Sequence, residues 1–82
     1  MLKIMIIEDE PAIREELALL LEDEGYTPLV ITKFTDVPSQ AAQERPYLIL
    51  LDIGLPGKDG FSLCAALRKA VPAPVISITF HL

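Results

Sequence analysis

YLILLDIGLPGKDG, residues 47–60, is the stretch of sequence that decides the fold. Its first five residues, 47–51, form an apolar run typical of a β-strand that is buried on both faces, as strands of parallel sheets are. Asp52 follows directly, and residues 53–60 are rich in the Gly and Pro of turns. Open α/β sheets bind their ligands where a strand ends and a loop begins. A buried strand that delivers one acid to such a loop indicates a functional site at Asp52.

The composition limits the chain to one small domain. Its 82 residues are 51% hydrophobic, which disfavours disorder, and 12 acidic against 7 basic residues give a net charge of −5. This charge argues against nucleic acid or an anionic membrane as a direct partner and favours a cation or a basic partner. No apolar run approaches the roughly 20 residues of a membrane span, and the start lacks the features of a signal peptide. Because the single Cys64 excludes an internal disulfide, we expect a cytoplasmic protein.

Four apolar runs alternate with three helical patterns along the chain. The sequence predicts strands at about residues 2–7, 27–32, 47–51 and 74–79, and helices at about residues 11–24, 37–45 and 59–70. Pro28 places the second strand at an edge, because proline cannot donate to a ladder. Since each later strand follows a helix, we expect a parallel sheet with right-handed crossovers, an α/β fold.

Apolar stripes predict which faces of the helices are buried. Residues at helical spacing form these stripes: Ile13, Leu17, Leu20 and Leu21 in the first helix, and Phe61, Cys64, Leu67 and Val71 in the last. Cys64 is interpreted as a small buried residue and His81, near the chain end, as a solvated one. Glu10 and Arg14 have the i,i+4 spacing of an ion pair.

Polar side chains lie at the ends of three of the predicted strands: Glu8 and Asp9 follow the first, Asp52 follows the third, and Thr79 ends the fourth. In a parallel sheet these strand ends meet at one edge, where the three carboxylates would repel one another unless a cation offsets their charge. Mg²⁺ prefers oxygen ligands and needs only one or two carboxylates beside phosphate oxygens. A hydroxyl such as that of Thr79 donates to an anionic oxygen, and Asp52 lies centrally enough to be a nucleophile. The set predicts a site for a phosphoryl group beside Mg²⁺.

Each of these residues also has a purely structural interpretation. An acidic run before a helix more often stabilises the helix N-terminus than binds a metal. Asp52 alone is equally consistent with an acid that caps the following loop, and Thr79 with an ordinary β-branched strand residue. The conjunction at one edge favours a site, because the structural account needs three unrelated reasons.

The chain resembles the receiver domain of bacterial two-component response regulators, from its IIEDEPAIRE opening through LILLDIGLPGKDGF to PVISIT. The resemblance implies a doubly wound, flavodoxin-like sheet with strand order 2-1-3-4. It also implies that Asp52 accepts a phosphoryl group from the phosphohistidine of a sensor histidine kinase. Asp9 would ligate Mg²⁺ directly, Glu8 mainly through water and Gly54 through its main-chain carbonyl, while Thr79 would bind the phosphoryl group and switch rotamer. The segment LLDIGLPGKDGF is most similar to receivers of winged-helix transcriptional regulators.

Departures from the family pattern shape the remaining expectations. Receivers usually have five strands and five helices, so residues 1–82 would be a partial receiver that lacks the last strand, the last two helices and any effector domain. The missing part normally supplies a Lys to the phosphoryl group, and Phe80 stands where a small residue is usual, so we expect impaired switching. The uncovered apolar edge of the fourth strand predicts a homo-oligomer.

Two other functions compete with phosphoacceptance. A degenerate receiver would bind a partner without being phosphorylated, and the missing Lys and Phe80 favour it. A haloacid-dehalogenase-like phosphohydrolase would also use a strand-end Asp and Mg²⁺, but it carries a second acid where this chain has Gly54. We therefore expect a stoichiometric phosphoacceptor rather than an enzyme.

Overall fold

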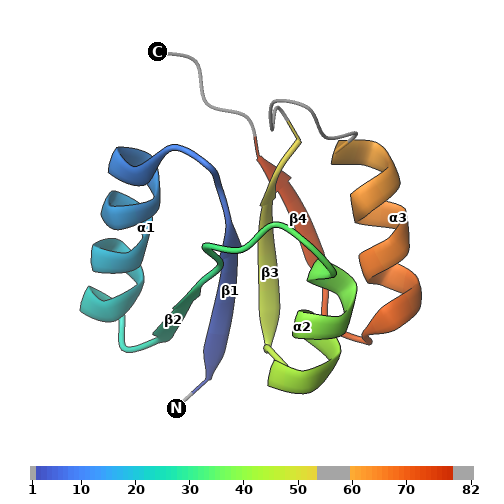
Figure 1. The fold of residues 1–82 in the computed structure, drawn as a ribbon. Coiled ribbons are helices and arrows are strands. Elements are labelled where there is room, and N and C mark those ends of the chain that lie inside the picture. Colours follow the sequence, from blue (N-terminus) through green and yellow to red (C-terminus); the bar gives the residue numbers. More distant parts are fainter. Residues whose placement is uncertain (1, 54–59, 79–82) are drawn as a thin grey trace.

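The computed structural model describes residues 2–53 and 60–78, which form a four-stranded parallel sheet with three helices (Figure 1). The elements are β1 (Lys3–Ile7), α1 (Pro11–Asp23), β2 (Thr27–Val30), α2 (Val37–Glu44), β3 (Leu48–Asp52), α3 (Gly60–Ala70) and β4 (Val75–Ile78). The strands lie in the order β2-β1-β3-β4, which confirms the predicted fold class and strand order. Within the described ranges, no helix is both long enough and apolar enough to cross a membrane.

The register of the sheet places the strand ends level with one another. β1 pairs with β3 so that Ile4 lies beside Leu48 and Ile7 beside Leu51. β3 in turn pairs with β4, with Asp52 beside Ile78. All pairs are parallel, so the carboxyl ends of the strands share the upper edge of the sheet in Figure 1.

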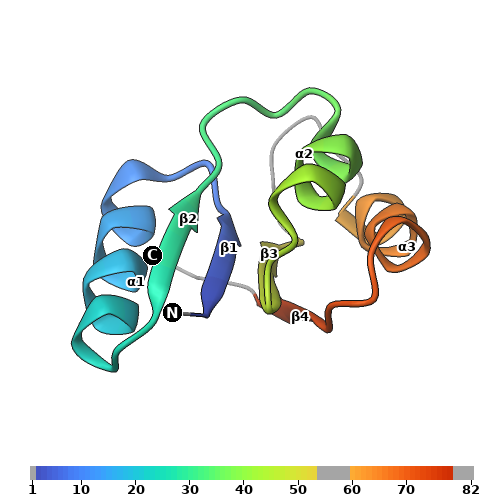
Figure 2. The same cartoon turned by 90° about the horizontal axis from the view of Figure 1, so that it is seen from below.

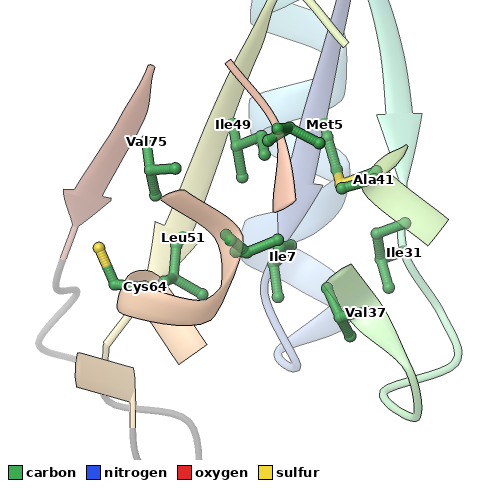
Figure 3. Packing of buried hydrophobic residues seen from close by; sticks show 11 residues of the cluster. Met5, Ile7, Ile31, Val37, Ala41, Ile49, Leu51, Cys64 and Val75 are labelled. Atoms are coloured by element: carbon green, nitrogen blue, oxygen red, sulfur yellow. The ribbon is translucent and has the colours of Figure 1, made fainter. Parts of the chain in front are cut away.

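The helices cover the two faces of the sheet unequally (Figure 2). α1 lies on one face and packs against β1 and β2, whereas α2 and α3 lie together on the other face. The main core fills the space between the sheet and this helix pair, as Figure 3 shows. Its buried members are Met5, Ile7, Ile31, Val37, Ala41, Ile49, Leu51, Cys64, Leu67, Val71 and Val75. The core therefore supports the sheet from the side opposite α1.

The sheet face under α1 is less buried than the sequence predicts. In β3, Ile49 and Leu51 are buried against the core, but Leu48 and Leu50 are only half-buried. The strand buried on both faces is β1, where the side chains from Ile4 to Ile7 are buried. The reason is that α1 packs over β1 and β2, so the same face of β3 has less cover.

Two residues of the predicted apolar stripes are exposed instead of buried. Leu20 in α1 is 60% exposed, and Phe61 at the start of α3 is 73% exposed. Cys64, Leu67 and Val71 are buried as predicted. Helical spacing identified the residues that share a face correctly, but the neighbouring elements do not extend over every residue of that face.

Gly25 ends α1 as the sequence predicts, with a φ of 90° that suits glycine. The amide of Tyr26 donates to the carbonyl of Leu21 at 2.9 Å, and the amide of Gly25 donates to the carbonyl of Glu22 at 3.0 Å. These two bonds form a Schellman motif. The motif turns the chain from α1 into the edge strand β2, where Pro28 lies as predicted.

Candidate functional site

Three carboxylates meet at the carboxyl edge of the sheet. Glu8 and Asp9 follow the last residue of β1, Asp52 is the last residue of β3, and the pairing of Ile7 with Leu51 brings these strand ends together. One carboxylate oxygen from each acid lies within 4.8 Å of the others. The predicted convergence of these acids is therefore present in the structure.

The acids differ in their exposure to solvent. Glu8 is 1% and Asp52 7% exposed, whereas Asp9 is exposed. Burying a carboxylate is costly unless a hydrogen bond, an opposite charge or a bound cation compensates it. Keeping Glu8 and Asp52 ionised therefore costs free energy in the absence of a cation, while the side of Asp9 is accessible from solvent. A site for a small cation requires both properties.

Glu8 is only partly satisfied by its neighbours. Its Oε1 accepts a hydrogen bond from the amide of Glu10 at 3.0 Å, while its Oε2 is buried and accepts none from the described residues. The pKa of Glu8 is raised from 4.5 to about 7, and burial is the largest cause of this rise. The hydrogen bond from Glu10 opposes this rise in pKa, and the neighbouring Asp52 and Asp9 carboxylates add to it. Glu8 is thus an acid whose ionised form needs a further positive partner.

Arg14 joins the acidic segment in a way that the sequence did not reveal. Its side chain does not form the predicted ion pair with Glu10 in the described part of the chain. Instead, its Nη1 donates to the main-chain carbonyl of Glu8 at 3.3 Å, and its amide donates to the carbonyl of Glu10 at 3.0 Å. The spacing of Glu10 and Arg14 indicated that the side chain reaches back along the helix, but not which acceptor it meets.

The three acids could together bind a small metal ion such as the expected Mg²⁺. Mg–O distances of about 2.1 Å put two ligand oxygens at most about 4.2 Å apart, slightly less than the 4.8 Å that bounds this cluster. Small side-chain movements, or a water between one acid and the ion, close this difference. The unsatisfied Oε2 of Glu8 and the exposed Asp9 are the kinds of oxygen that such an ion or its waters would contact.

The remaining predicted site residues, Gly54 and Thr79, lie outside the described residues. Their roles in binding the metal and the phosphoryl group stay predictions. The same holds for Phe80 and for its expected effect on access to Asp52.

The chain on either side of residues 54–59 is held together tightly. Gly60, the first residue of α3, approaches the backbone of Ile53 so closely that a Cβ atom on it would lie 2.5 Å from the Ile53 Cα. The amide of Ile53 also donates to the carbonyl of Ile78 in β4 at 3.1 Å. The residue after Asp52 is therefore fixed between α3 and β4.

Open parallel α/β sheets form a class of proteins that bind their ligands at the carboxyl ends of the strands, which is where the carboxylates of this chain meet. The chain belongs to the response regulator receiver domain family, whose model matches residues 4–82. Domains of this family are generally phosphoacceptors rather than catalysts, and this membership favours the receiver interpretation over the phosphohydrolase one.

Curated relatives link the chain to transcriptional regulators. It is 42% identical over 77 residues to the transcriptional regulatory protein YxdJ of Bacillus subtilis (strain 168) and 38% identical over 77 residues to the transcriptional regulatory protein BaeR of Escherichia coli. These alignments include 94% of this chain but only 34% of the YxdJ sequence and 32% of the BaeR sequence. The chain thus spans about a third of the length of the curated relatives it matches.

Solved receiver domains have the same fold. The N-terminal domain of the nisin resistance regulator NsrR matches with a TM-score of 0.82 and 37% identity, over 93% of this chain and 64% of that one. The BeF3-activated receiver domain of Klebsiella pneumoniae RstA matches with a TM-score of 0.83 and 36% identity, over 94% of this chain and 66% of that one. The response regulator TrrA, solved in complex with the histidine kinase ThkA, belongs to a structure that matches with a TM-score of 0.77 and 30% identity, over 100% of this chain and 72% of that one.

Proposed function

We propose that residues 1–82 are the phosphoacceptor module of a two-component pathway, with Asp52 as the residue that is phosphorylated. The observation that carries this proposal is the position of Asp52, a buried carboxylate at the end of a central strand, grouped with Glu8 and Asp9 within 4.8 Å in a chain of the receiver family. A capping role would account for one acid but not for the grouping of three.

In the proposed reaction, a carboxylate oxygen of Asp52 attacks the phosphorus atom of a phosphohistidine. The new O–P bond forms as the N–P bond breaks, which leaves an acyl phosphate on Asp52 and returns the electron pair to the imidazole. Mg²⁺, when bound by Glu8, Asp9, Asp52 and the carbonyl of Gly54, would neutralise the charge of the phosphoryl oxygens. The hydroxyl of Thr79 would donate a hydrogen bond to the transferred group.

The proposed phosphoryl donor is a sensor histidine kinase. Support comes from the similar response regulator TrrA, whose structure was solved in complex with a histidine kinase. The similarity to transcriptional regulatory proteins supports control of transcription as the output of the whole protein, and cytoplasmic action follows from both proposals.

Incubation with acetyl phosphate and Mg²⁺ tests the phosphoacceptor role directly. The wild-type chain should gain one hydroxylamine-labile phosphoryl group, as seen by intact mass, because an acyl phosphate reacts with hydroxylamine. Asp52→Asn should not gain it, and Asp23→Asn, an exposed acid at the end of α1, should behave as the wild type.

The same measurement decides between phosphoacceptance and the degenerate receiver. Absence of labelling in the wild type, or equal labelling of the wild type and Asp52→Asn, would favour a module that binds its partner without phosphorylation. The expected impairment of switching stays a prediction, which the extent and lifetime of labelling would quantify.

A further inference from the structure

Arg14 is a cation directly behind the acidic cluster. It lies in the first part of α1, and its guanidinium Nη1 reaches back 3.3 Å to the carbonyl oxygen of Glu8. The same carbonyl belongs to the first residue after β1, where the chain leaves the sheet. Arg14 therefore connects the helix to the segment that carries two of the three acids.

The segment of residues 8–10 is held by hydrogen bonds to Glu8, which accepts one through its side chain and one through its main chain. The carboxylate of Glu8 accepts a hydrogen bond from the amide of Glu10 at 3.0 Å, and the carbonyl of Glu8 accepts one from Arg14. The amide of Arg14 closes the network by donating to the carbonyl of Glu10 at 3.0 Å. These bonds oppose the mutual repulsion of Glu8, Asp9 and Asp52, which would otherwise turn the segment outward.

We propose that Arg14 is a positioning residue of the cation site: its hydrogen bond to the Glu8 carbonyl holds the Glu8 and Asp9 carboxylates towards Asp52 before a cation binds. The inference rests on the proposed function, because it assigns Arg14 to the Mg²⁺ site of that function. Arg14 touches neither the cation nor the phosphoryl group in this role. It acts through the main chain of Glu8, as residues around a metal site commonly orient the ligands.

A simple electrostatic role for Arg14 predicts the opposite result. If its charge only offset the acids, Arg14 would compete with the cation, and removing the charge would strengthen Mg²⁺ binding. If Arg14 positions the acids, its removal weakens binding, because the segment must then be ordered when the cation arrives. The direction of the change in affinity separates the two roles.

The experiment compares Mg²⁺ affinity, by isothermal titration, in the wild type, Arg14→Met, Arg14→Lys and Arg68→Met. Arg68 is a matched control, because its Nη2 also donates to a main-chain carbonyl, that of Val75 at 3.4 Å, at the far end of β4 from the acids. We expect Arg14→Met to weaken Mg²⁺ binding about tenfold, the low end of the range for residues that orient metal ligands. Arg14→Lys should restore most of the affinity, since an ammonium group still donates to the Glu8 carbonyl, and Arg68→Met should bind as the wild type.

Hydrogen exchange of the Glu10 amide in the metal-free chain provides a second readout. This amide donates to Glu8 Oε1, so its exchange should accelerate several-fold in Arg14→Met and remain unchanged in Arg68→Met. Unchanged or tighter Mg²⁺ binding in Arg14→Met would overturn the positioning role, as would equal weakening in Arg68→Met. A wild type that binds Mg²⁺ but is not labelled at Asp52 would instead contradict the proposed function, so the two failures are distinguishable.

Discussion

Gly60 and Ile53 are in backbone contact across the segment that follows the candidate site. A Cβ atom at Gly60 would lie 2.5 Å from both the Cα and the carbonyl oxygen of Ile53. Neither atom belongs to a flexible side chain that can move aside, and Ile53 directly follows Asp52. The absence of a side chain at position 60 therefore allows α3 to begin against the end of β3.

Gly60→Ala should destabilise the fold by about 2 kcal/mol or more, since the new methyl group must push backbone away from backbone. In a helix without such a contact, the same change would be stabilising by about 1 kcal/mol, because alanine favours helix over glycine. Urea unfolding shows whether Gly60→Ala lowers or raises the free energy of unfolding. Gly25→Ala serves as the control, because its Cβ would meet nothing within 4 Å and only the φ of 90° opposes it. A Gly60→Ala chain as stable as the wild type would contradict the contact.

The raised pKa of Glu8 predicts that the metal-free chain loses stability as the pH rises from about 4.5 to about 7. In this interval the folded chain retains a proton on Glu8 that the unfolded chain has released, so raising the pH favours unfolding. The loss should be on the order of 1 to 3 kcal/mol, measured by urea unfolding in the presence of a chelator.

Glu8→Gln isolates this contribution from that of the other acids. Its neutral amide resembles the protonated carboxyl, so the variant should be more stable than the wild type at pH 8, and the difference should vanish near pH 4. A constant difference across this range would show that Glu8 does not titrate as predicted.

Mg²⁺ should raise the melting temperature of the chain, because a ligand that binds only the folded state stabilises it. At a free concentration of about 100 times Kd, the gain in the free energy of unfolding is about 2.7 kcal/mol. The gain should increase with pH through about 7, because the ionised form of Glu8 binds the cation better. Asp9→Ala should abolish most of it, whereas Asp23→Ala should not. An equal rise in the melting temperature of both variants would indicate nonspecific binding.

The outer edge of β4 predicts self-association. β4 has a strand neighbour on one side only within the described residues, and its Ile76 is 47% exposed. An apolar edge strand is a template for pairing with another chain, and a charge on the edge opposes this. Sedimentation at increasing concentration should therefore show association that Ile76→Lys reduces. Leu19→Lys, at a residue of α1 that is more exposed than Ile76, should have little effect, and a monomer at every concentration would contradict the prediction.

The sequence predicted the order of the elements because its signals are strong and local. Short apolar runs alternate with helical stripes, and each observed element begins and ends within two residues of the predicted one. The meeting of Glu8, Asp9 and Asp52 was also predictable, because parallel strands must share one edge for their carboxyl ends.

The details that the sequence did not predict depend on contacts between elements. The exposure of Leu20, Phe61 and one face of β3 follows from how far the neighbouring helices extend, which periodicity does not specify. The contact of Arg14 with the Glu8 carbonyl depends on the direction in which the chain leaves β1. Sequence spacing alone determines neither how far the helices extend over the sheet nor the direction in which the chain leaves β1.

The pairing of β1 with β3 has a mechanical consequence for the acids at its end. Glu8 and Asp9 directly follow β1, and Asp52 ends the neighbouring β3, so a cation held by all three would link the ends of the two central strands. Sliding the strands by two residues would move the acids about 6.6 Å apart along the sheet, too far for one Mg²⁺ to bridge. Cation binding would therefore resist shear of the central pair. If the strands slipped by two residues in a variant with intact helices, that variant would lose cation binding.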